Sequence, residues 1–335
     1  MKTISLLKTE EAISYVKRTF TDELSRKLSL TPVSAPIIVM DKTGINDDLN
    51  GIERPVKFPI KSMQEEQAVV VHSLAKWKRM RLAELNIEVE KGIITDMRAL
   101  RPDEDYSRLH SIYVDQWDWE KHMFKTDRTL DYLKETVKKV YESLKATEQK
   151  ISEKYPGIDA CLPSEITFIH AEELLKLYPE LSPKEREDKI TEKFGAVFII
   201  GIGGKLSDGE PHDGRAPDYD DWSTKNEDGF YGLNGDIIVW HPTLKCAFEI
   251  SSMGIRVDKK SLKRQLEIQQ CPEKAELKFH KLLLEDELPQ SIGGGIGQSR
   301  VCMFMLRKTH IGEVQVSVWP DAIKAELAEE GVALL

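Results

Sequence analysis

The sequence has few cysteines and no long apolar run. Its four cysteines, at positions 161, 246, 271 and 302, lie far apart, and none belongs to a Cys-x-x-Cys pair. This spacing indicates neither a zinc site nor a disulfide framework, and it favours a reduced, cytoplasmic setting. No apolar stretch approaches the length of a membrane span, and the first residues turn acidic too soon for a signal peptide. We therefore expect no membrane partner.

A surplus of basic residues is also missing. The 335 residues include 48 Lys and Arg against 57 Asp and Glu, which gives a formal net charge of -9. Contacts with nucleic-acid phosphates need a basic face, so this charge balance argues against a dedicated nucleic-acid-binding protein. The same charge balance still allows local basic pockets. The length fits one large domain or two ordinary ones, and neither repeats nor a clear linker divide it.

Hydrophobic periodicity predicts both helices and strands. The predicted helices cover residues 13–28, 73–85, 129–155, 183–194, 262–266 and 277–284, with a further buried helix after residue 300. The predicted strands cover residues 31–39, 56–60, 68–71, 93–100, 110–120, 196–200, 236–240, 245–256 and 310–318.

Cations occupy the first turns of the helix that Ser73 is expected to cap. Lys76, Lys78 and Arg79 lie at the end of the helix where the backbone dipole favours negative charge. This electrostatic misfit indicates either an anionic ligand close to the helix or a solvated helix face.

Side chains alternate along the predicted strand at 110–120. Gln116 and Asp118 lie on one face of this strand, whereas Trp117 and Trp119 lie on the other. A polar pair that continues an otherwise apolar face is typical of the floor of a pocket. The alternative is a strand that emerges into solvent.

Two loops are candidates for ligand sites. Residues 201–207 follow a buried strand but do not match a phosphate-binding P-loop, because Lys205 is followed by Leu206 and the first glycine of the motif would fall at Ile199. The stretch 212–222 is dense in charged and aromatic residues, which fits an active-site loop or a merely solvated one.

Acidic residues stand out at two places. If residues 241–244 form the loop of a hairpin, the register places Asp236 opposite Glu249, with Cβ atoms about 5 Å apart. Two facing carboxylates repel unless a cation or a shared proton joins them, and Mg²⁺ bound to substrate phosphates commonly takes such ligands. Asp47 and Asp48 are turn residues or include a catalytic carboxylate.

Residues 291–300 contain four glycines within five positions and end in Arg300. Such a backbone can approach a flat group closely or bend where other residues cannot. The apolar run at 301–306 predicts a buried helix that begins near Arg300, whose guanidinium could stack on a ring or bind a phosphate. The alternative is a packing turn between a helix and a strand, with Arg300 on the surface.

The whole chain resembles the ammonia-dependent asparagine synthetases, the aspartate-ammonia ligase family. The runs that carry this resemblance are residues 70–79, 99–105, 113–120, 201–209 and 293–300. That family is similar to the catalytic domain of class II aspartyl-tRNA synthetases. Here the similarity covers the first helix and strand up to Pro36, the loop arginine Arg101 and the Arg300 motif. It implies a single α+β catalytic domain over residues 1–335, a mainly antiparallel sheet flanked by helices, and a homodimer formed partly through the first helix and strand.

The resemblance also implies the chemistry. ATP and aspartate would react with Mg²⁺ to give β-aspartyl-adenylate and pyrophosphate, after which ammonia would displace AMP. Arg101 would hold the α-phosphate, Arg300 would stack on adenine, and Arg215 would meet the outer phosphates. Asp236 and Glu249 would bind Mg²⁺. Positive groups around the displacement stabilise its moving charge, so Arg101 and Arg300 are expected to act in catalysis.

The resemblance also implies the amino-acid site, if aspartate binds in the opposite orientation to the substrate of the tRNA synthetase. In the tRNA synthetase, a lysine and an arginine matching Lys78 and Arg256 hold the side-chain carboxylate. The ligase activates that carboxylate, so the same two cations should grip the α-carboxylate. The other expected residues are Ser73, Gln116 and Asp118 at the amino group, Ser251 and Ser252 in the substrate site, and Gly295 beside ATP.

The ammonia step needs a carboxylate that accepts a proton from ammonium, for which Asp47 and Asp220 are the candidates. A tRNA synthetase or another aminoacyl-transferring paralogue is the first alternative, and we expect no room for its N-terminal anticodon-binding barrel. A non-catalytic sensor of ATP or aspartate is the second, but every charged position named above is present. A glutamine-dependent enzyme would need cysteine where this chain has Lys2. We therefore expect small-molecule partners only.

Overall fold

The computed structural model describes residues 6–49 and 53–335, so Lys2 lies outside the described residues. The strands of its main sheet are β1 (Leu30–Pro32), β5 (Gly92–Leu100), β6 (Tyr113–His122), β7 (Thr167–His170), β8 (Ala196–Ile200), β9 (Asn234–His241), β10 (Cys246–Ile255) and β11 (Ser291–Gly297). They lie in the order β1-β5-β6-β11-β10-β9-β8-β7. The outer pairs β1–β5 and β7–β8 are parallel, and the pairs between them are antiparallel. The predicted α+β fold with a mainly antiparallel sheet is confirmed.

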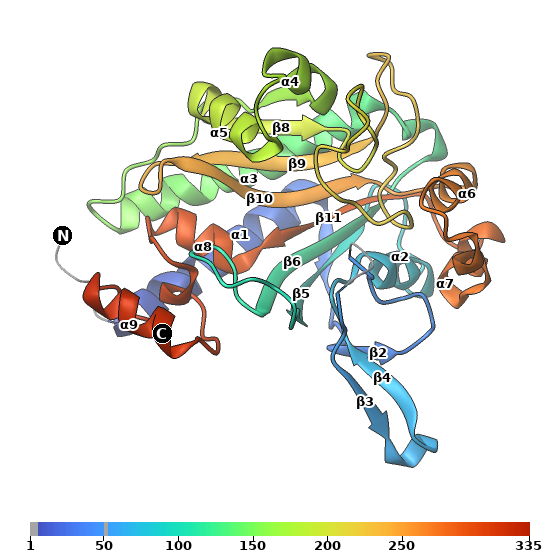
Figure 1. Ribbon diagram of the computed structural model, residues 1–335, viewed down its shortest axis with the longest axis horizontal. Coiled ribbons are helices and arrows are strands. Elements are labelled where there is room, and N and C mark those ends of the chain that lie inside the picture. The colour runs from blue at the N-terminus through green and yellow to red at the C-terminus, as the bar shows by residue number, and fades with distance from the viewer. Residues whose placement is uncertain (1–5, 50–52) are drawn as a thin grey trace.

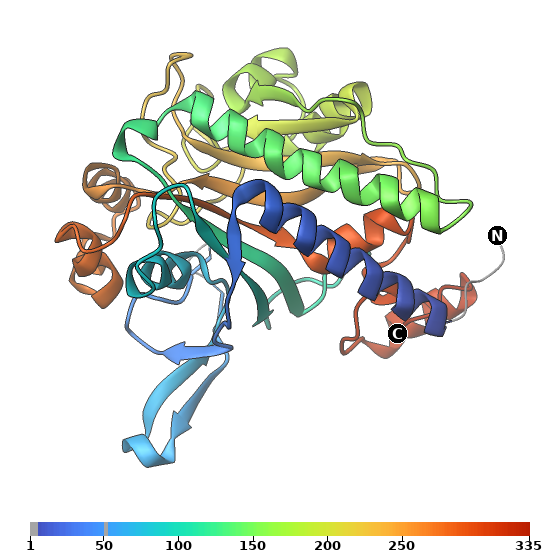
Figure 2. The same cartoon turned by 180° about the vertical axis from the view of Figure 1, so that it is seen from behind.

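Helices cover one face of this sheet (Figures 1 and 2). The long helices α1 (Leu6–Leu28) and α3 (Leu130–Lys154) lie side by side across it, and the buried helix α8 (Gln298–Met305) packs beside α1. The apolar faces of these helices form the main core together with strand residues such as Trp117 and Trp119. This face of the sheet is therefore closed by packing, which leaves the opposite face for a site.

The remaining helices lie around the other face and the ends of the sheet (Figure 1). They are α2 (Ala75–Glu84), α4 (Ala171–Leu177), α5 (Pro183–Phe194), α6 (Lys259–Ile268), α7 (Lys278–Leu284) and α9 (Asp321–Glu329), with short 3-10 helices η1 (Lys61–Met63), η2 (Lys125–Asp127), η3 (Pro272–Glu276) and η4 (Ile311–Glu313). Every helix within the described ranges is too short or too polar to cross a lipid bilayer.

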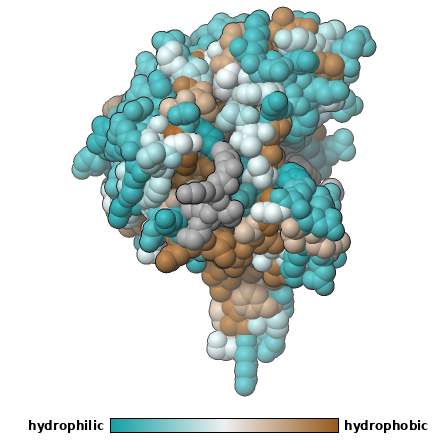
Figure 3. Space-filling view, turned by 90° about the vertical axis from the view of Figure 1, so that its left-hand side faces the viewer, coloured by the Kyte–Doolittle hydropathy of each residue, from teal (hydrophilic) through white to brown (hydrophobic). Residues whose placement is uncertain are grey.

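A small antiparallel sheet projects from the body as an arm (Figure 1). Its strands are β2 (Ile38–Met40), β4 (Glu66–Val70) and β3 (Lys57–Ile60), in that order. Seen from the side, hydrophobic residues gather where the arm joins the body (Figure 3). Ile37 and Ile38, at the start of β2, are more than a third exposed.

The strand predicted over residues 31–39 is divided between the two sheets. β1 ends at Pro32, and β2 begins only at Ile38. Pro32 and Pro36 have no backbone N–H to continue a ladder, so the chain leaves the main sheet between them.

Two further predictions need correction. The strand predicted over 310–318 is wrong: His310 accepts a hydrogen bond from the Gly312 N–H and caps the 3-10 helix η4, and residues 314–320 have irregular structure. Helix α2 begins at Ala75 with Leu74 at its N-cap, so Ser73 is not the capping residue. Ser73 Oγ instead donates to Asp47 Oδ2, 26 residues away, whereas His310 makes a local cap that ends any extended structure there.

Candidate active site

A cavity of about 500 Å³ opens beside the sheet. This volume suits a small-molecule ligand. The residues predicted for the site all line it: Asp47, Ser73, Lys78, Arg101, Gln116, Asp118, Arg215, Asp220, Asp236, Glu249, Ser251, Ser252, Arg256, Gly295 and Arg300. The tertiary structure therefore brings together every predicted residue, while the individual roles stay predictions.

The glycine-rich stretch is the central strand β11, rather than a turn, and Arg300 lies in the first turn of the helix that follows it. Its missing side chains leave room for polar groups from neighbouring strands. A Cβ atom on Gly295 would lie 2.4 Å from Gln116 Oε1, and one on Gly293 would lie 2.0 Å from Glu120 Oε2. The glycines thus form a floor on which buried polar side chains rest.

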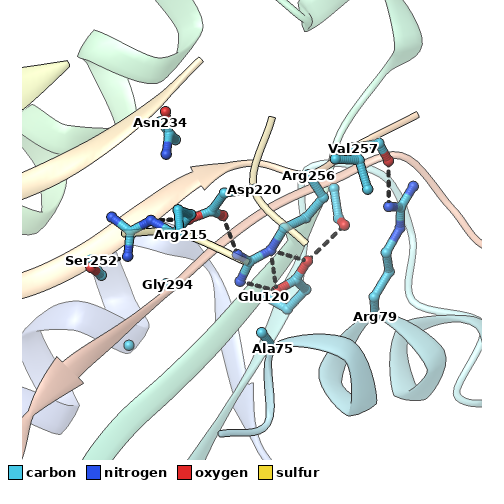
Figure 4. Close-up of polar contacts among 12 residues, drawn as sticks. Ala75, Arg79, Glu120, Arg215, Asp220, Asn234, Ser252, Arg256, Val257 and Gly294 are labelled. Carbon is cyan, nitrogen blue, oxygen red and sulfur yellow. Dashed lines mark hydrogen bonds and ion pairs between the residues drawn. The ribbon is translucent and has the colours of Figure 1, made fainter. Parts of the chain in front are cut away.

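Arg256 is held between two carboxylates (Figure 4). Its guanidinium donates to both oxygens of Glu120 at 2.8 to 3.1 Å and to Asp220 at 2.5 Å. Burial alone would lower the pKa of Arg256, but Glu120 and Asp220 outweigh it and raise that pKa. Sequence reasoning missed Glu120, although strand alternation places it on the same face as Gln116 and Asp118.

Lys78 is buried beside Asp118. Its Nζ donates to Asp118 Oδ1 at 2.6 Å and to the Gly294 carbonyl at 2.9 Å. Burial lowers the pKa of Lys78, although Asp118 opposes this shift. Among the described residues Asp118 Oδ2 has no hydrogen-bond partner. A buried acceptor of this kind needs a donor, which the amino group of a substrate would supply.

The solvated-face alternative for the cations of α2 is wrong. Lys76, Lys78 and Arg79 are each only 1% exposed. Arg79 donates to the carbonyls of Val257 and Pro289 at 2.6 and 2.9 Å, and burial lowers its pKa to about 9. These cations are therefore compensated by buried carboxylates and carbonyls, which only the tertiary structure supplies.

The predicted pairing of Asp236 with Glu249 is wrong in register. Glu249 lies opposite Ile238, and beyond a bulge Asp236 lies opposite Ser252. The hairpin loop begins one residue later than predicted and ends in Lys245, whose φ is 54°. That offset moves the partner of Glu249 by two residues, from Asp236 to Ile238, which keeps its side chain on the same face. The bulge moves the partner of Asp236 by one residue more. Both carboxylates consequently still line the cavity.

A cation of the chain itself contacts Asp236. Arg215 donates to Asp236 Oδ1 at 2.5 Å and to Ser252 Oγ at 2.7 Å. Burial and the nearby charge of Glu249 raise the pKa of Asp236 to about 6. Burial acts in the same direction on Glu249, but the positive charges of Arg300, Lys184 and Arg215 together outweigh it and lower the pKa of Glu249.

The loop at 212–222 is an active-site wall rather than a solvated loop. It contributes Arg215 and Asp220 to the cavity and buries Trp222, whose Nε1 donates to the Ala216 carbonyl at 3.1 Å. The preceding glycine segment joins β8 to this wall with no helix after it, so the exclusion of a P-loop is confirmed.

His110 is a second residue that sequence reasoning missed. Arg300 Nη2 donates to His110 Nε2 at 2.6 Å, and His110 Nδ1 lies 2.8 Å from Ser107 Oγ. Burial and the charge of Arg300 lower the pKa of His110 to about 4, so the ring is neutral and accepts this bond. Arg300 also lies 3.5 Å from the Glu249 carboxylate.

Asp47 and Asp220 lie in the same cavity, and both are buried. Asp47 accepts hydrogen bonds from Ser73 Oγ and from a backbone N–H, each at 2.9 Å. Burial raises the pKa of Asp47. Asp48 instead forms an exposed ion pair with Lys274 and does not line the cavity, which fits a turn residue.

Comparison with solved structures gives the class of the fold. The asparaginyl-tRNA synthetase of Pyrococcus horikoshii, complexed with asparaginyl-adenylate, matches with a TM-score of 0.67 and 15% identity, over 93% of this chain and 70% of that chain. The aspartyl-tRNA synthetase of Entamoeba histolytica matches with a TM-score of 0.58 and 14% identity, over 92% of this chain and 58% of that one. The fold is that of a class II aminoacyl-tRNA synthetase catalytic core.

Sequence comparison gives the family. The aspartate-ammonia ligase model matches residues 7–331. The aspartate-ammonia ligase of Parabacteroides distasonis is 56% identical over 99% of this chain and 96% of its own length, and that of Clostridium perfringens strain 13 is 55% identical over the same shares. The chain belongs to the aspartate-ammonia ligase family. It is an enzyme that makes asparagine from aspartate and ammonia, which confirms the predicted function.

Proposed function

We propose that the cavity activates the β-carboxylate of aspartate with ATP and then lets ammonia displace AMP. A carboxylate oxygen of aspartate attacks the α-phosphorus, and pyrophosphate leaves. Ammonia then attacks the acyl carbon, AMP leaves, and one proton is lost. The observation that carries this proposal is that one cavity holds the nucleotide-side cations Arg101, Arg215 and Arg300 together with the amino-acid pair Lys78 and Asp118.

The nucleotide end of the cavity fits ATP. Arg101 has a buried Nε with no hydrogen-bond partner among the described side chains, so it can donate to an α-phosphate. Arg300 is partly exposed and available to stack on adenine. Glycine at position 295 keeps the strand beneath free of side chains.

Asp236 and Glu249 fit a divalent cation shared with ATP. Both carboxylates line the cavity, and burial together with the charge of Glu249 raises the pKa of Asp236. A cation between them would offset that repulsion. The described residues contain no cluster of three or more potential metal ligands. Mg²⁺ would therefore depend on phosphate oxygens for its other ligands, and when bound it would neutralise phosphate charge.

The amino-acid end fits aspartate held by its α-groups. Lys78 would grip the α-carboxylate, and Asp118 Oδ2 would accept from the amino group with help from Ser73 and Gln116. Arg256 adds positive charge, although Glu120 and Asp220 already engage it. Ser252 lies beside Asp236, whereas Ser251 Oγ donates to the Gly295 carbonyl at 3.0 Å and supports the floor.

Asp47 or Asp220 would accept the proton that ammonium must lose. Both are buried in the cavity wall, and burial raises the pKa of Asp47, which makes its carboxylate a better proton acceptor. Arg101 and Arg300 would stabilise the charge that moves onto the leaving groups.

The assembly is also proposed. Residues 1–335 would act as one domain, since one sheet runs from β1 to β7 and contains strands from both halves of the chain. A homodimer would form partly through α1 and β1, and it could also cover Ile37 and Ile38, which follow β1 in the chain and are exposed. The enzyme would work in the cytoplasm on small molecules, without nucleic acid.

The first experiment incubates the pure protein with aspartate, ammonium and Mg·ATP, without tRNA, and measures asparagine, AMP and ADP. Asparagine with an equal amount of AMP is expected. ADP in place of AMP would overturn the adenylate route. Pyrophosphate exchange without asparagine would instead indicate an enzyme that acylates a macromolecule.

A further inference from the structure

A cluster of buried ionisable groups lies behind the cavity wall that carries Asp47 and Asp220. Lys76 Nζ donates to Asp218 Oδ2 at 2.8 Å, and His280 Nε2 lies 3.0 Å from the same oxygen. All three side chains are at most 2% exposed, and none of them lines the cavity. Burying charged groups costs free energy. Their position behind the wall of the proposed active site therefore indicates a functional role.

The cluster joins three separate segments. Lys76 is on α2 and Asp218 is on the wall at 212–222, and both of these segments line the cavity. His280 is on α7, which supports the loop that carries Asp47. A Cβ atom on Gly44 of that loop would lie only 2.9 Å from His280 Nδ1, and a 3.2 Å backbone hydrogen bond also joins α7 to the loop.

Charges from several elements face Asp47. Burial raises the pKa of Asp47, the positive charge of Lys76 lowers it, and the negative charge of Asp218 raises it. His72 Nδ1 lies 3.1 Å from the Asp47 carbonyl. Burial, together with the charge of Asp47, raises the pKa of Tyr219. Lys76 and Asp218 thus act on Asp47 with opposite signs.

We propose that the Lys76–Asp218–His280 cluster is a positioning device for the ammonia step. It fixes the Asp47 loop against the segment that carries Asp220, and it places one positive and one negative charge beside Asp47. Lys76 and Asp218 are positioning residues, because neither reaches the cavity. The inference rests on the proposed role of Asp47 and Asp220 as proton acceptors.

Two variants with opposite expected effects test this device. Lys76→Met removes a positive charge, which raises the pKa of Asp47. The acid limb of the pH profile of kcat/KM for ammonia should therefore move to higher pH by about one unit. Asp218→Asn removes a negative charge and should move this limb to lower pH by about the same amount. Asparagine formation is followed with saturating aspartate and ATP. The ionisation of ammonia is the same in every assay. Differences between the pH profiles of the variants therefore come from the enzyme.

Aspartate-dependent exchange of pyrophosphate into ATP, measured without ammonia, is the internal reference. It should stay within about threefold of the parent chain, because the changed side chains lie outside the cavity. The double variant Lys76→Met, Asp218→Asn removes the pair as a unit, so it keeps the test open if a single variant fails to fold. It should lose about tenfold in kcat/KM for ammonia and keep exchange.

The matched control is Glu148→Gln, which removes a buried charge paired with Arg307 at 2.7 Å and does not line the cavity. It should lower thermal stability without moving the acid limb. Equal losses in exchange and in asparagine formation, an unmoved limb, or shifts in the same direction for both cluster variants would overturn the positioning role. Asp47→Asn and Asp220→Asn test the underlying function. If neither slows the ammonia step relative to exchange, the assignment of the proton acceptors is wrong.

Discussion

Arg215 donates to Asp236 at 2.5 Å, so a guanidinium of the chain neutralises one of the two carboxylates proposed for Mg²⁺. The same arginine is proposed to bind the outer phosphates of ATP. Binding of Mg·ATP would therefore exchange one cation for another at Asp236. The protonation state of Asp236 should therefore report on the binding of Mg·ATP.

The apparent affinity for Mg²⁺ should fall as the pH drops through about 6. The pKa of Asp236 is raised to about 6, and a carboxyl that binds a proton cannot bind the metal. Titrating Mg²⁺ at fixed ATP and several pH values measures this. Glu249→Gln removes the like charge, so its profile should shift to lower pH, whereas Asp228→Asn at the surface should leave it unchanged. A pH-independent Mg²⁺ affinity would contradict the metal role of Asp236.

Lys78→Ala should raise KM for aspartate about ten- to hundredfold, the effect expected for loss of a charge-assisted hydrogen bond. KM for ATP should change little. The variant leaves Asp118 without its cation, so thermal unfolding must be recorded as well. Lys78→Arg, which keeps the charge, should recover part of the affinity. Wild-type affinity for aspartate in a folded Lys78→Ala protein would exclude the end-for-end orientation.

Gly295→Ala should reduce kcat/KM for aspartate at least tenfold, because the new methyl group would lie 2.4 Å from Gln116 Oε1. Steady-state kinetics with varied aspartate measure this loss. Gly209→Ala is the control: its Cβ meets no atom within 4 Å, while its φ of 92° still costs about 1 kcal/mol. Equal kinetic effects of the two substitutions would mean that Gly295 does not shape the substrate site.

His110→Ala should raise KM for ATP several-fold and leave KM for aspartate unchanged, because Arg300 loses the acceptor that fixes its guanidinium. His110→Gln, which can still accept, should restore most of the affinity. The pKa of His110 is lowered to about 4, so this effect should be constant from about pH 6 to 8. A KM for ATP that follows a histidine titration in that range would show that the ring does become charged.

Local patterns predicted several elements because their causes lie within a few residues. Ser182 accepts from the Glu185 N–H and opens α5 with a capping box, and this helix has the bounds predicted for it. Alternation separated Gln116 and Asp118 from the buried Trp117 and Trp119, and the cavity lies on the polar side. The same alternation would have found Glu120 if it had been followed two residues further.

Long-range features were predicted less well. The hairpin register failed because a loop shift of one residue costs little locally yet changes every cross-strand partner, including that of Asp236. His110 carried no local signal, because its role depends on Arg300, which is 190 residues away.

The sequence by itself determined most helices and strands and the family, with the α+β class that the family implies, since periodicity and long motif runs are written along the chain. Only the tertiary structure decided which charges are buried and with what partners. The sequence left open whether Lys76 and Lys78 face an anionic ligand or solvent. Asp218 and Asp118, 142 and 40 residues further along the chain, pair with them in the interior. A buried charge depends on a partner at hydrogen-bond distance, and that distance exists only after the strands and loops have packed.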